Sequence, residues 1–297
     1  MKSPQPDNET STAIPPEMLS VTPEPTQTKN EEGNVTEPVL QQQPIYLWNE
    51  GNIPTTTEYK ENNSGYFDPP DFRPNMEYFP AKQGIQVKGA VLICAGGAFQ
   101  FRGNENEGFP VAEALSELGY QSFVVNYRLR PYTQEEGALD LARAVRYVRN
   151  HARDYGIDEK NIAVIGFSAG GILCGELLLH FDGLVNGTAI DPTYVPDELD
   201  KVVADAGAVA MIYSFYGRLS VASTDVEKFK ESDLPPTYFL YGSDEVFRSQ
   251  IEACAKAAQQ ACVPVESQIL EGWQHGFGAR GDWFAGFDAW LTKVFGS

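Results

Sequence analysis

The chain has few cysteines, few histidines and few basic residues for its length. Its four cysteines and three histidines show neither zinc-ligand spacing nor a disulfide framework, so we expect no metal and no cofactor. Only 22 lysines and arginines stand against 41 acidic residues, and the formal charge of −19 repels phosphate backbones and anionic membrane surfaces. No apolar run is long enough to span a bilayer. These shortages argue against a nucleic-acid-binding protein, a metalloprotein or an integral membrane protein.

Apolar residues are also scarce in the first part of the chain. Residues 1–43 are rich in Pro, Thr, Glu, Gln and Asn and have almost no aromatic or β-branched clusters to bury, so they are predicted to be a disordered tail or linker. Such a stalk is typical of a surface-tethered domain, although an intracellular tail has a similar composition. We expect an extracellular or cell-surface-tethered protein whose leader is absent from this sequence, with a cytoplasmic protein as the alternative.

From residue 44 to residue 297 the composition becomes that of one folded catalytic domain. Short apolar, β-branched runs alternate with helical stretches, a pattern typical of parallel βαβ units. The runs are near-continuously apolar, as strands covered on both faces require. The sequence therefore predicts an α/β-hydrolase fold: a mostly parallel central sheet flanked by helices, with little or no cap. Strands are predicted at 90–94, 122–126, 162–166, 209–213, 237–241 and 265–270, and helices at about 108–118, 137–155, 169–180, 247–262 and 282–295.

A Gly-x-Ser-x-Gly pattern centred on Ser168 lies between a predicted strand and a predicted helix. A serine on such a sharp turn is held above the sheet edge, and the flanking glycines, Gly166 and Gly170, remove side chains that would otherwise collide there. The helix that follows also points its free N–H groups at the reacting centre. Ser168 is therefore the candidate nucleophile.

A serine hydroxyl needs a general base within hydrogen-bond reach. His275 lies in a glycine-rich loop after the last strand, at the sheet edge where ligands bind in open α/β folds. His151 sits among arginines at a helix end, and His180 ends the helix after Ser168, where a cation suits the helix dipole. We therefore expect His275 to be the base and the other two histidines to be structural.

The third member of a triad should be a carboxylate that follows the penultimate strand and orients the imidazole. Asp244 is preferred because it is the first acid after that strand and Gly242-Ser243 form the turn. Glu245 and Asp225 remain alternatives, and either acid of the 244–245 pair could instead cap the next helix.

Acyl transfer also needs backbone N–H donors for the developing oxyanion. Ala169, the residue after the nucleophile, should supply one of them. The glycine-rich loop at 95–99, which follows the first long strand, should supply the others through Gly97 and Ala98. Aromatic residues beside these positions, Phe99, Trp273 and Phe277, are candidate substrate-binding residues.

Together these motifs resemble the α/β-hydrolase esterases related to the hormone-sensitive-lipase family, and within them the carbohydrate acetyl- and feruloyl-esterase-like enzymes. The resemblance spans about residues 45–295. Its other markers are the segment 46–51, the loop 94–99 and the run Asn126-Tyr127-Arg128-Leu129. The resemblance implies the same triad of Ser168, Asp244 and His275, the same three oxyanion donors, and a structural role for Arg128 in tying a loop near the site.

The function expected from these residues is hydrolysis of carboxylic esters through an acyl-enzyme. We expect short acyl esters, acetyl first, of carbohydrates such as acetylated xylan, with feruloyl esters second, and a small-molecule or carbohydrate ester as the binding partner. A general carboxylesterase or lipase is the main alternative, but the stretch 217–234 is too short and polar for an apolar lid. A non-catalytic binding protein on a hydrolase scaffold is the alternative from another class.

Overall fold

A mixed eight-stranded sheet forms the centre of the protein in the computed structural model, which describes residues 43–60 and 68–296. The strand order is β1-β2-β4-β3-β5-β6-β9-β10, and every neighbouring pair from β4 to β10 is parallel. The first two strands pair antiparallel at one edge. The strands are β1 (Ile45–Tyr46), β2 (Asn75–Phe79), β3 (Gly89–Cys94), β4 (Tyr120–Asn126), β5 (Ile162–Phe167), β6 (Ala208–Ile212), β9 (Thr237–Gly242) and β10 (Val265–Leu270).

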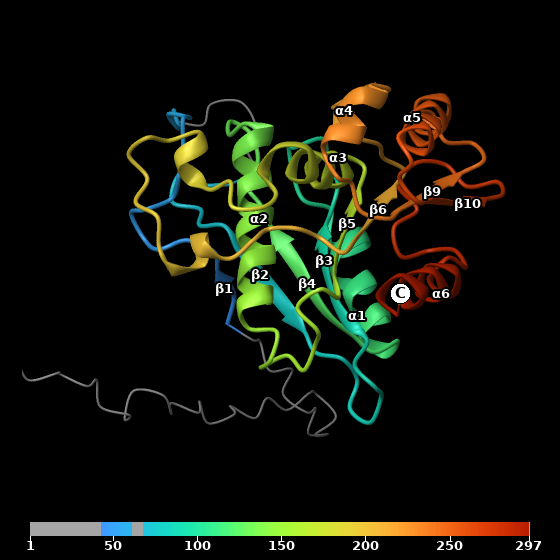
Figure 1. Ribbon diagram of the computed structural model, residues 1–297, viewed down its shortest axis with the longest axis horizontal. Coiled ribbons are helices and arrows are strands. Elements are labelled where there is room, and N and C mark those ends of the chain that lie inside the picture. Colours follow the sequence, from blue (N-terminus) through green and yellow to red (C-terminus); the bar gives the residue numbers. More distant parts are fainter. Residues whose placement is uncertain (1–42, 61–67, 297) are drawn as a thin grey trace, which may run out of the picture. The chain divides into compact units, whose positions relative to one another are not determined.

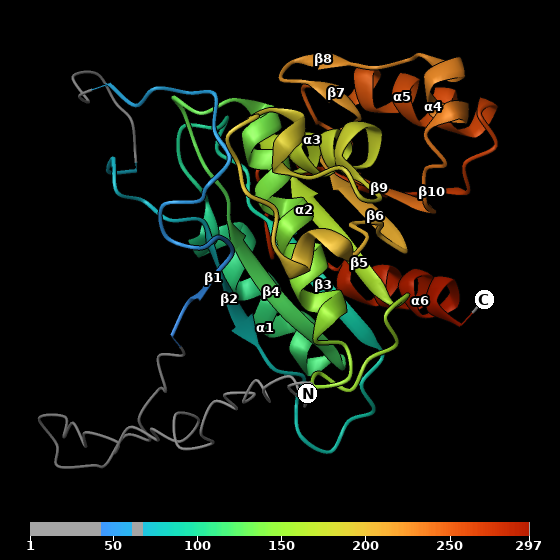
Figure 2. The same ribbon diagram turned by 60° about the vertical axis from the view of Figure 1, so that its left-hand side comes forward.

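Helices cover both faces of this sheet (Figures 1 and 2). Alternate residues of a strand pack on opposite faces. Val91 and Ile93 of β3 pack in the cluster formed with α1 and α6, whereas Leu92 and Cys94 pack in the cluster formed with α2, α3 and α5. The helices are α1 (Phe109–Glu117), α2 (Gln134–Asn150), α3 (Ala169–Glu176), α4 (Val226–Glu231), α5 (Arg248–Gln260) and α6 (Phe284–Phe295). Shorter turns are the π-helical η2 (Asn104–Gly108) and η3 (Leu177–Phe181) and the 3-10 turns η4 (Gly187–Ala189) and η5 (Glu198–Lys201).

The predicted α/β-hydrolase architecture is confirmed. Each of the six predicted strands is present, shifted by two residues at most, and α1, α3, α5 and α6 begin within two residues of their predicted starts. The antiparallel edge strands β1 and β2 are not predicted by the sequence pattern. Neither are the small elements between β6 and β9, which are α4 and the hairpin of β7 (Gly217–Arg218) and β8 (Val221–Ala222). Residues 1–42 of the predicted tail lie outside the described residues.

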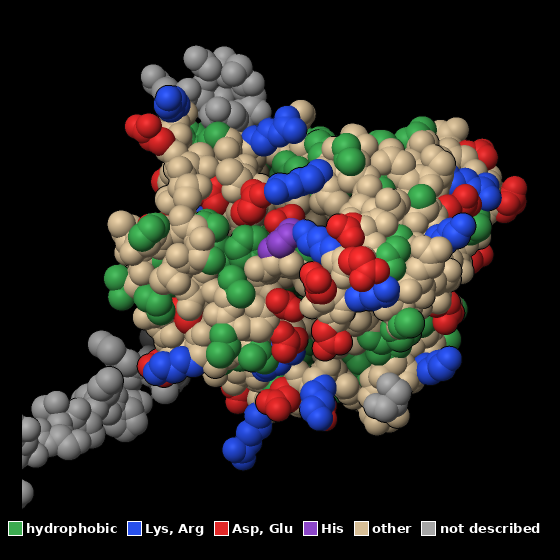
Figure 3. Space-filling view, turned by 45° about the horizontal axis from the view of Figure 1, so that its top comes forward, with side chains coloured by type: hydrophobic (Ala, Val, Ile, Leu, Met, Phe, Trp, Pro, Cys, Tyr) green, Lys and Arg blue, Asp and Glu red, His purple; other side chains and the backbone are tan. Residues whose placement is uncertain are grey.

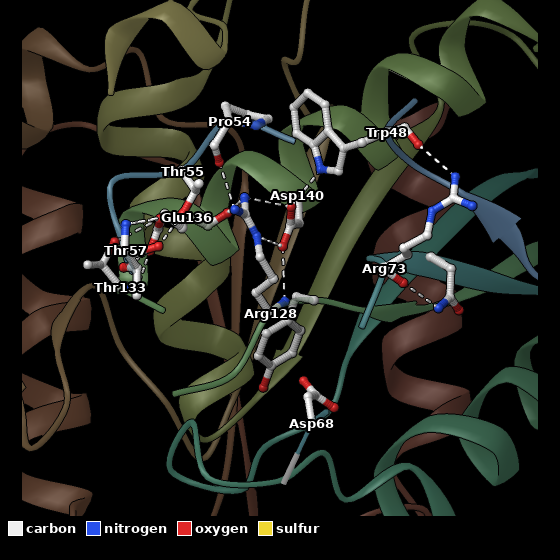
Figure 4. A network of polar contacts seen from close by, with 12 residues as sticks. Trp48, Pro54, Thr55, Thr57, Asp68, Arg73, Arg128, Thr133, Glu136 and Asp140 are labelled. Carbon is white, nitrogen blue, oxygen red and sulfur yellow. Dashed lines mark hydrogen bonds and ion pairs between the residues drawn. The ribbon is translucent and has the colours of Figure 1, made fainter. Parts of the chain in front are cut away.

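Arg128 anchors the segment that precedes β2 to the rest of the domain (Figure 4). Its guanidinium donates to both carboxylate oxygens of Asp140 at 2.9 Å and to the carbonyl oxygen of Pro54 at 2.7 Å. Trp48 Nε1 donates to the same aspartate at 2.7 Å. Because Arg128 is buried and its bond to Pro54 joins residues 74 positions apart, its contacts support the predicted role in tying a loop.

Glu136, one helical turn before Asp140, binds the same segment through a second set of contacts (Figure 4). Its carboxylate accepts hydrogen bonds from the hydroxyls of Thr55 and Thr57, at 2.5 and 2.6 Å, and from the backbone N–H of Thr133 at 2.7 Å. Burial alone would raise the pKa of Glu136, but these hydrogen bonds and the nearby Arg128 charge outweigh it and lower that pKa. The carboxylate therefore contributes to the fold in its ionised form.

Basic side chains are scattered over the face drawn in Figure 3. On this face, the described Lys and Arg side chains lie among acidic and apolar ones and form no continuous basic band. Among the residues that the structure describes, no helix combines the length and the apolar character needed to cross a membrane.

Candidate active site

Ser168 occupies the strand-to-helix turn that the sequence predicts. Strand β5 ends at Phe167, helix α3 begins at Ala169, and Ser168 between them has φ 50° and ψ −116°, a strained conformation for a residue with a side chain. A side chain at Gly170 could not be accommodated, because its Cβ would lie 2.0 Å from the carbonyl oxygen of Cys94. The turn therefore depends on glycine beside the serine, as predicted.

The loop after β10 brings His275 to this serine. Its Nε2 lies 2.9 Å from Ser168 Oγ, a hydrogen-bond distance between residues 107 positions apart in the sequence. The imidazole packs on the Tyr213 ring, with the ring centroids 4.8 Å apart, and its side chain is 31% exposed. The histidine is thus held on one side by an aromatic ring and remains open to solvent on another.

The other two histidines make contacts elsewhere. His151 stacks on Tyr147, with ring centroids 4.2 Å apart, and its Nδ1 lies 2.8 Å from the Tyr147 carbonyl oxygen. His180 Nδ1 lies 2.8 Å from Glu176 Oε1. His180 Nε2 also lies 2.5 Å from Lys228 Nζ of α4. These contacts agree with the expectation that both histidines are structural.

The carboxylate beside His275 belongs to Glu245, and the expectation that Asp244 would contact the imidazole is wrong. Both oxygens of Glu245 lie within 2.9 and 3.0 Å of His275 Nδ1, and the Glu245 side chain is fully buried. Asp244 is exposed, and its carboxylate accepts a hydrogen bond from Ser243 Oγ. Asp225, the remaining alternative, caps α4 by accepting from the backbone N–H of Lys228.

The contact of His275 with Glu245 instead of Asp244 has a local cause. Strand β9 continues to Gly242, so Ser243 and Asp244 occupy the turn itself and Glu245 closes it through a hydrogen bond from its N–H to the Gly242 carbonyl. Glu245 Oε1 also accepts from the Phe247 N–H at the start of α5. The acid nearer to the strand is therefore exposed, and the carboxylate of the next one contacts both the Phe247 N–H and the histidine.

The loop that should supply oxyanion donors lies against Ser168. A Cβ atom on Gly96 would come within 2.9 Å of Ser168 Cβ, so the backbone of this loop approaches the nucleophile closely. Gly97, Ala98 and Phe99 then follow with φ values of 132°, 53° and 58°. Assignment of the Gly97, Ala98 and Ala169 N–H groups as oxyanion donors stays a prediction.

The three candidate aromatic residues differ in their exposure. Trp273 is half-buried and accessible, and Phe99 is 9% exposed with its ring against Tyr127. Phe277 is 1% exposed and packs under Tyr213, so the expectation that it contacts substrate is wrong. Sequence analysis missed Phe101, which is 49% exposed and has its ring within 3.0 Å of the Cβ position of Gly97.

Sequence analysis also missed Glu107 and Tyr213, which lie behind the histidine and the glycine-rich loop. Burial raises the pKa of Glu107, and hydrogen bonds from Tyr213 and Gly96 and the charge of His275 oppose that rise. Burial and the adjacent Glu107 raise the pKa of Tyr213 well above its ordinary value, so its hydroxyl keeps its proton. Neither residue was predicted, because Glu107 lies in a polar stretch typical of a surface loop and Tyr213 lies at the end of a predicted core strand.

The fold and this constellation define an α/β-hydrolase of the esterase type. The family model described as BD-FAE matches residues 77–258, which is more than half of the chain. The chain therefore belongs to the BD-FAE family.

Similar proteins agree with this family. Endo-1,4-beta-xylanase B of Butyrivibrio fibrisolvens is 26% identical over 78% of this chain and 39% of its own length. The acetylxylan esterase of Xylanibacter ruminicola is 33% identical over 28% of this chain and 18% of its own length. The chain thus spans less than half the length of these curated relatives.

Among solved structures, an acetyl ester-xyloside bifunctional hydrolase from Caldicellulosiruptor lactoaceticus matches with a TM-score of 0.64 and 26% identity, covering 86% of this chain and 95% of that one. The native esterase Est2 of Thermogutta terrifontis matches with a TM-score of 0.59 and 19% identity over 86% and 91% of the two chains, and supports the fold alone. These structural similarities agree with the α/β-hydrolase fold of the family.

Proposed function

We propose that this protein is a serine esterase that removes small acyl groups, acetyl first, from carbohydrate esters such as acetylated xylan. The observation that carries the proposal is the continuous contact from Ser168 Oγ through the His275 ring to the Glu245 carboxylate. The relatives named for xylanase, acetylxylan esterase and acetyl ester-xyloside hydrolase activities support the choice of substrate.

In the proposed reaction, His275 Nε2 takes the proton of Ser168 as Oγ attacks the ester carbonyl. Glu245 accepts the hydrogen bond from His275 Nδ1–H and stabilises the imidazolium that forms. The tetrahedral oxyanion receives hydrogen bonds from the N–H groups of Gly97, Ala98 and Ala169. His275 then gives its proton to the departing alcohol, which leaves an acyl-serine.

Water completes the cycle by the same steps. His275 takes a proton from water, the hydroxide attacks the acyl carbon, and the second oxyanion collapses as the proton returns to Ser168 Oγ. The carboxylic acid leaves and the enzyme is restored. Because Glu245 is fully buried while His275 and Ser168 are partly open, substrate and water reach only the reacting end of this chain of contacts.

Two accessible aromatic rings favour a bulky, ring-shaped alcohol or a feruloyl group over a long acyl chain. Phe101 lies against the glycine-rich loop, and Trp273 precedes His275 by two residues. Flat aromatic faces can cover a sugar or phenolic ring with little loss of side-chain entropy. Feruloyl esters are therefore the second substrate class to test.

A panel of acetyl, butyryl, octanoyl and feruloyl esters, together with acetylated xylan, tests the proposal. We expect catalytic efficiency to fall from acetyl to octanoyl, since each methylene that a site fails to accommodate costs about 1 to 3 kcal/mol. We also expect acetate release from xylan by the native chain and none by Ser168→Ala. Efficiency that rises toward octanoyl, without acetate release from xylan, would replace the proposal with a general carboxylesterase.

A further inference from the structure

Glu107 lies where the loops that carry the proposed catalytic groups meet. It belongs to η2, between the glycine-rich loop after β3 and helix α1, and the residue is only 8% exposed. Its two carboxylate oxygens each accept a hydrogen bond from a different part of the chain. An ionised carboxylate has acceptor capacity only, so this arrangement suits its charged form.

One oxygen of Glu107 fixes the glycine-rich loop. Oε2 accepts the N–H of Gly96 at 2.6 Å. Gly96 stands directly before the proposed oxyanion donors Gly97 and Ala98, and its Cβ position is 2.9 Å from Ser168 Cβ. A small displacement of Gly96 would therefore change where the next two N–H groups point relative to the reacting carbonyl.

The other oxygen of Glu107 fixes the support of the histidine. Oε1 accepts the hydroxyl of Tyr213 at 2.5 Å, and that hydroxyl accepts the N–H of Gly278 at 3.2 Å. The Tyr213 ring lies against His275, and Gly278 belongs to the same loop as the histidine. Tyr213 thus connects the carboxylate to both the ring and the loop of the proposed base.

The neighbouring Asn106 strengthens this connection. Its carbonyl oxygen accepts the N–H of Ala279 at 3.0 Å, and its side-chain amide donates to the Gly276 carbonyl at 3.2 Å. The turn η2 therefore contacts the histidine loop directly through Asn106 and indirectly through Glu107 and Tyr213, and it contacts the glycine-rich loop through Glu107.

We propose that Glu107 is a positioning residue that fixes the glycine-rich loop and the His275 loop relative to each other beside Ser168. This inference rests on the proposed serine esterase function and extends it to a residue that touches neither substrate nor the reacting atoms. Donors to an oxyanion act mainly in the transition state, so their misplacement lowers kcat more than it changes KM.

The test is Glu107→Gln, which keeps the size of the side chain but replaces one acceptor oxygen with a donor. We expect kcat for an acetyl ester to fall about tenfold to a hundredfold, less than the loss of a whole oxyanion donor, with KM changed less than about threefold. The rate of Ser168 phosphonylation by a fluorophosphonate should fall in parallel. Glu105→Gln is the matched control, because Glu105 is an exposed glutamate on the same turn, and it should behave as the native chain.

Tyr213→Phe provides an independent measurement if Glu107→Gln does not fold. It removes only the hydroxyl that joins Glu107 to Gly278, and we expect a loss of about tenfold in kcat with KM unchanged. The native chain must be active and the variant must be folded for this comparison. If kcat of the variant is then unchanged, or only its KM changes, the positioning role of Glu107 is overturned while the proposed function stands. A native chain that hydrolyses no ester would instead overturn the proposed function, and this inference with it.

Discussion

The polar network at Ser168 and the polar network at Arg128 are built from similar groups but differ in how completely each group is enclosed. Each contains a fully buried carboxylate side chain, Glu245 in the first and Asp140 in the second. In the first, the contacts run outward to a half-exposed serine and a histidine that is 31% exposed. In the second, the Arg128 side chain is 2% exposed and each of its guanidinium nitrogens donates to a protein oxygen.

This difference in enclosure predicts which network affects turnover and which affects the free energy of unfolding. In the first network, the accessible Ser168 Oγ is free to react with an ester. Truncation of the Ser168 side chain leaves no unpaired charge in the interior. A network that is closed on itself has no such atom, and removal of one partner leaves an unpaired charge in the interior. Substitutions in the first network should therefore change turnover, and substitutions in the second should change the free energy of unfolding.

Ser168→Ala should have the largest effect on turnover. We expect kcat for an acetyl ester to fall by about a millionfold, because members of a triad act as a unit. The melting temperature should stay within a few degrees of the native value, since the hydroxyl is not buried. Residual activity well above the background rate in a folded variant would remove Ser168 from the role of nucleophile.

Glu245→Gln and Asp244→Asn compare adjacent acids at the same turn. We expect Glu245→Gln to lower kcat about ten-thousandfold, because the amide no longer holds the imidazole in the required tautomer. Asp244→Asn is the matched control and should change kcat by less than about threefold, since Asp244 is exposed and does not contact His275. Steady-state kinetics with an acetyl ester decide between them, and the opposite ranking would contradict the triad.

Arg128→Ala should have its main effect on stability. Loss of the guanidinium leaves the Asp140 carboxylate buried without its counter-charge, which should cost about 3 to 5 kcal/mol in the free energy of unfolding. Chemical denaturation measures this loss, with Arg153→Ala, an exposed arginine beyond α2, as the control. The folded fraction should keep most of its kcat. A loss of activity at unchanged stability would place Arg128 in the site instead of in the scaffold.

Glu136→Gln should have a smaller effect that depends on pH. The native carboxylate has a lowered pKa, so it contributes stability above the ordinary pKa of glutamate and loses that contribution as the pH falls through the lowered value. We expect the variant to be about 1 to 3 kcal/mol less stable at pH 7. Denaturation at pH 7 and pH 3.5 should show this difference shrinking on acidification, and a difference that grows would refute the assignment.

The sequence predicts the parts of this molecule that are governed by local patterns. The apolar strands, the glycines around Ser168 and the loop of His275 are recognisable because each depends on neighbouring residues and on the shared edge of a parallel sheet. The choice between Asp244 and Glu245 depends on whether the turn after β9 is one residue shorter or longer. The amino-acid types in the turn do not reveal its length. The contact of Glu107 with Tyr213 joins residues 106 positions apart, and the burial of Phe277 depends on how its loop folds back over β6.

Phosphonylation tests most directly whether Ser168 is the activated nucleophile of this network. The native chain is incubated with a fluorophosphonate, and the modified peptide is identified by mass spectrometry beside Ser168→Ala and Asp244→Asn. We predict a single adduct on Ser168 in the native chain and in Asp244→Asn, and none in Ser168→Ala. An adduct on another residue, or an unmodified Ser168 in a chain that still hydrolyses acetyl esters, would contradict a mechanism built on Ser168, His275 and Glu245.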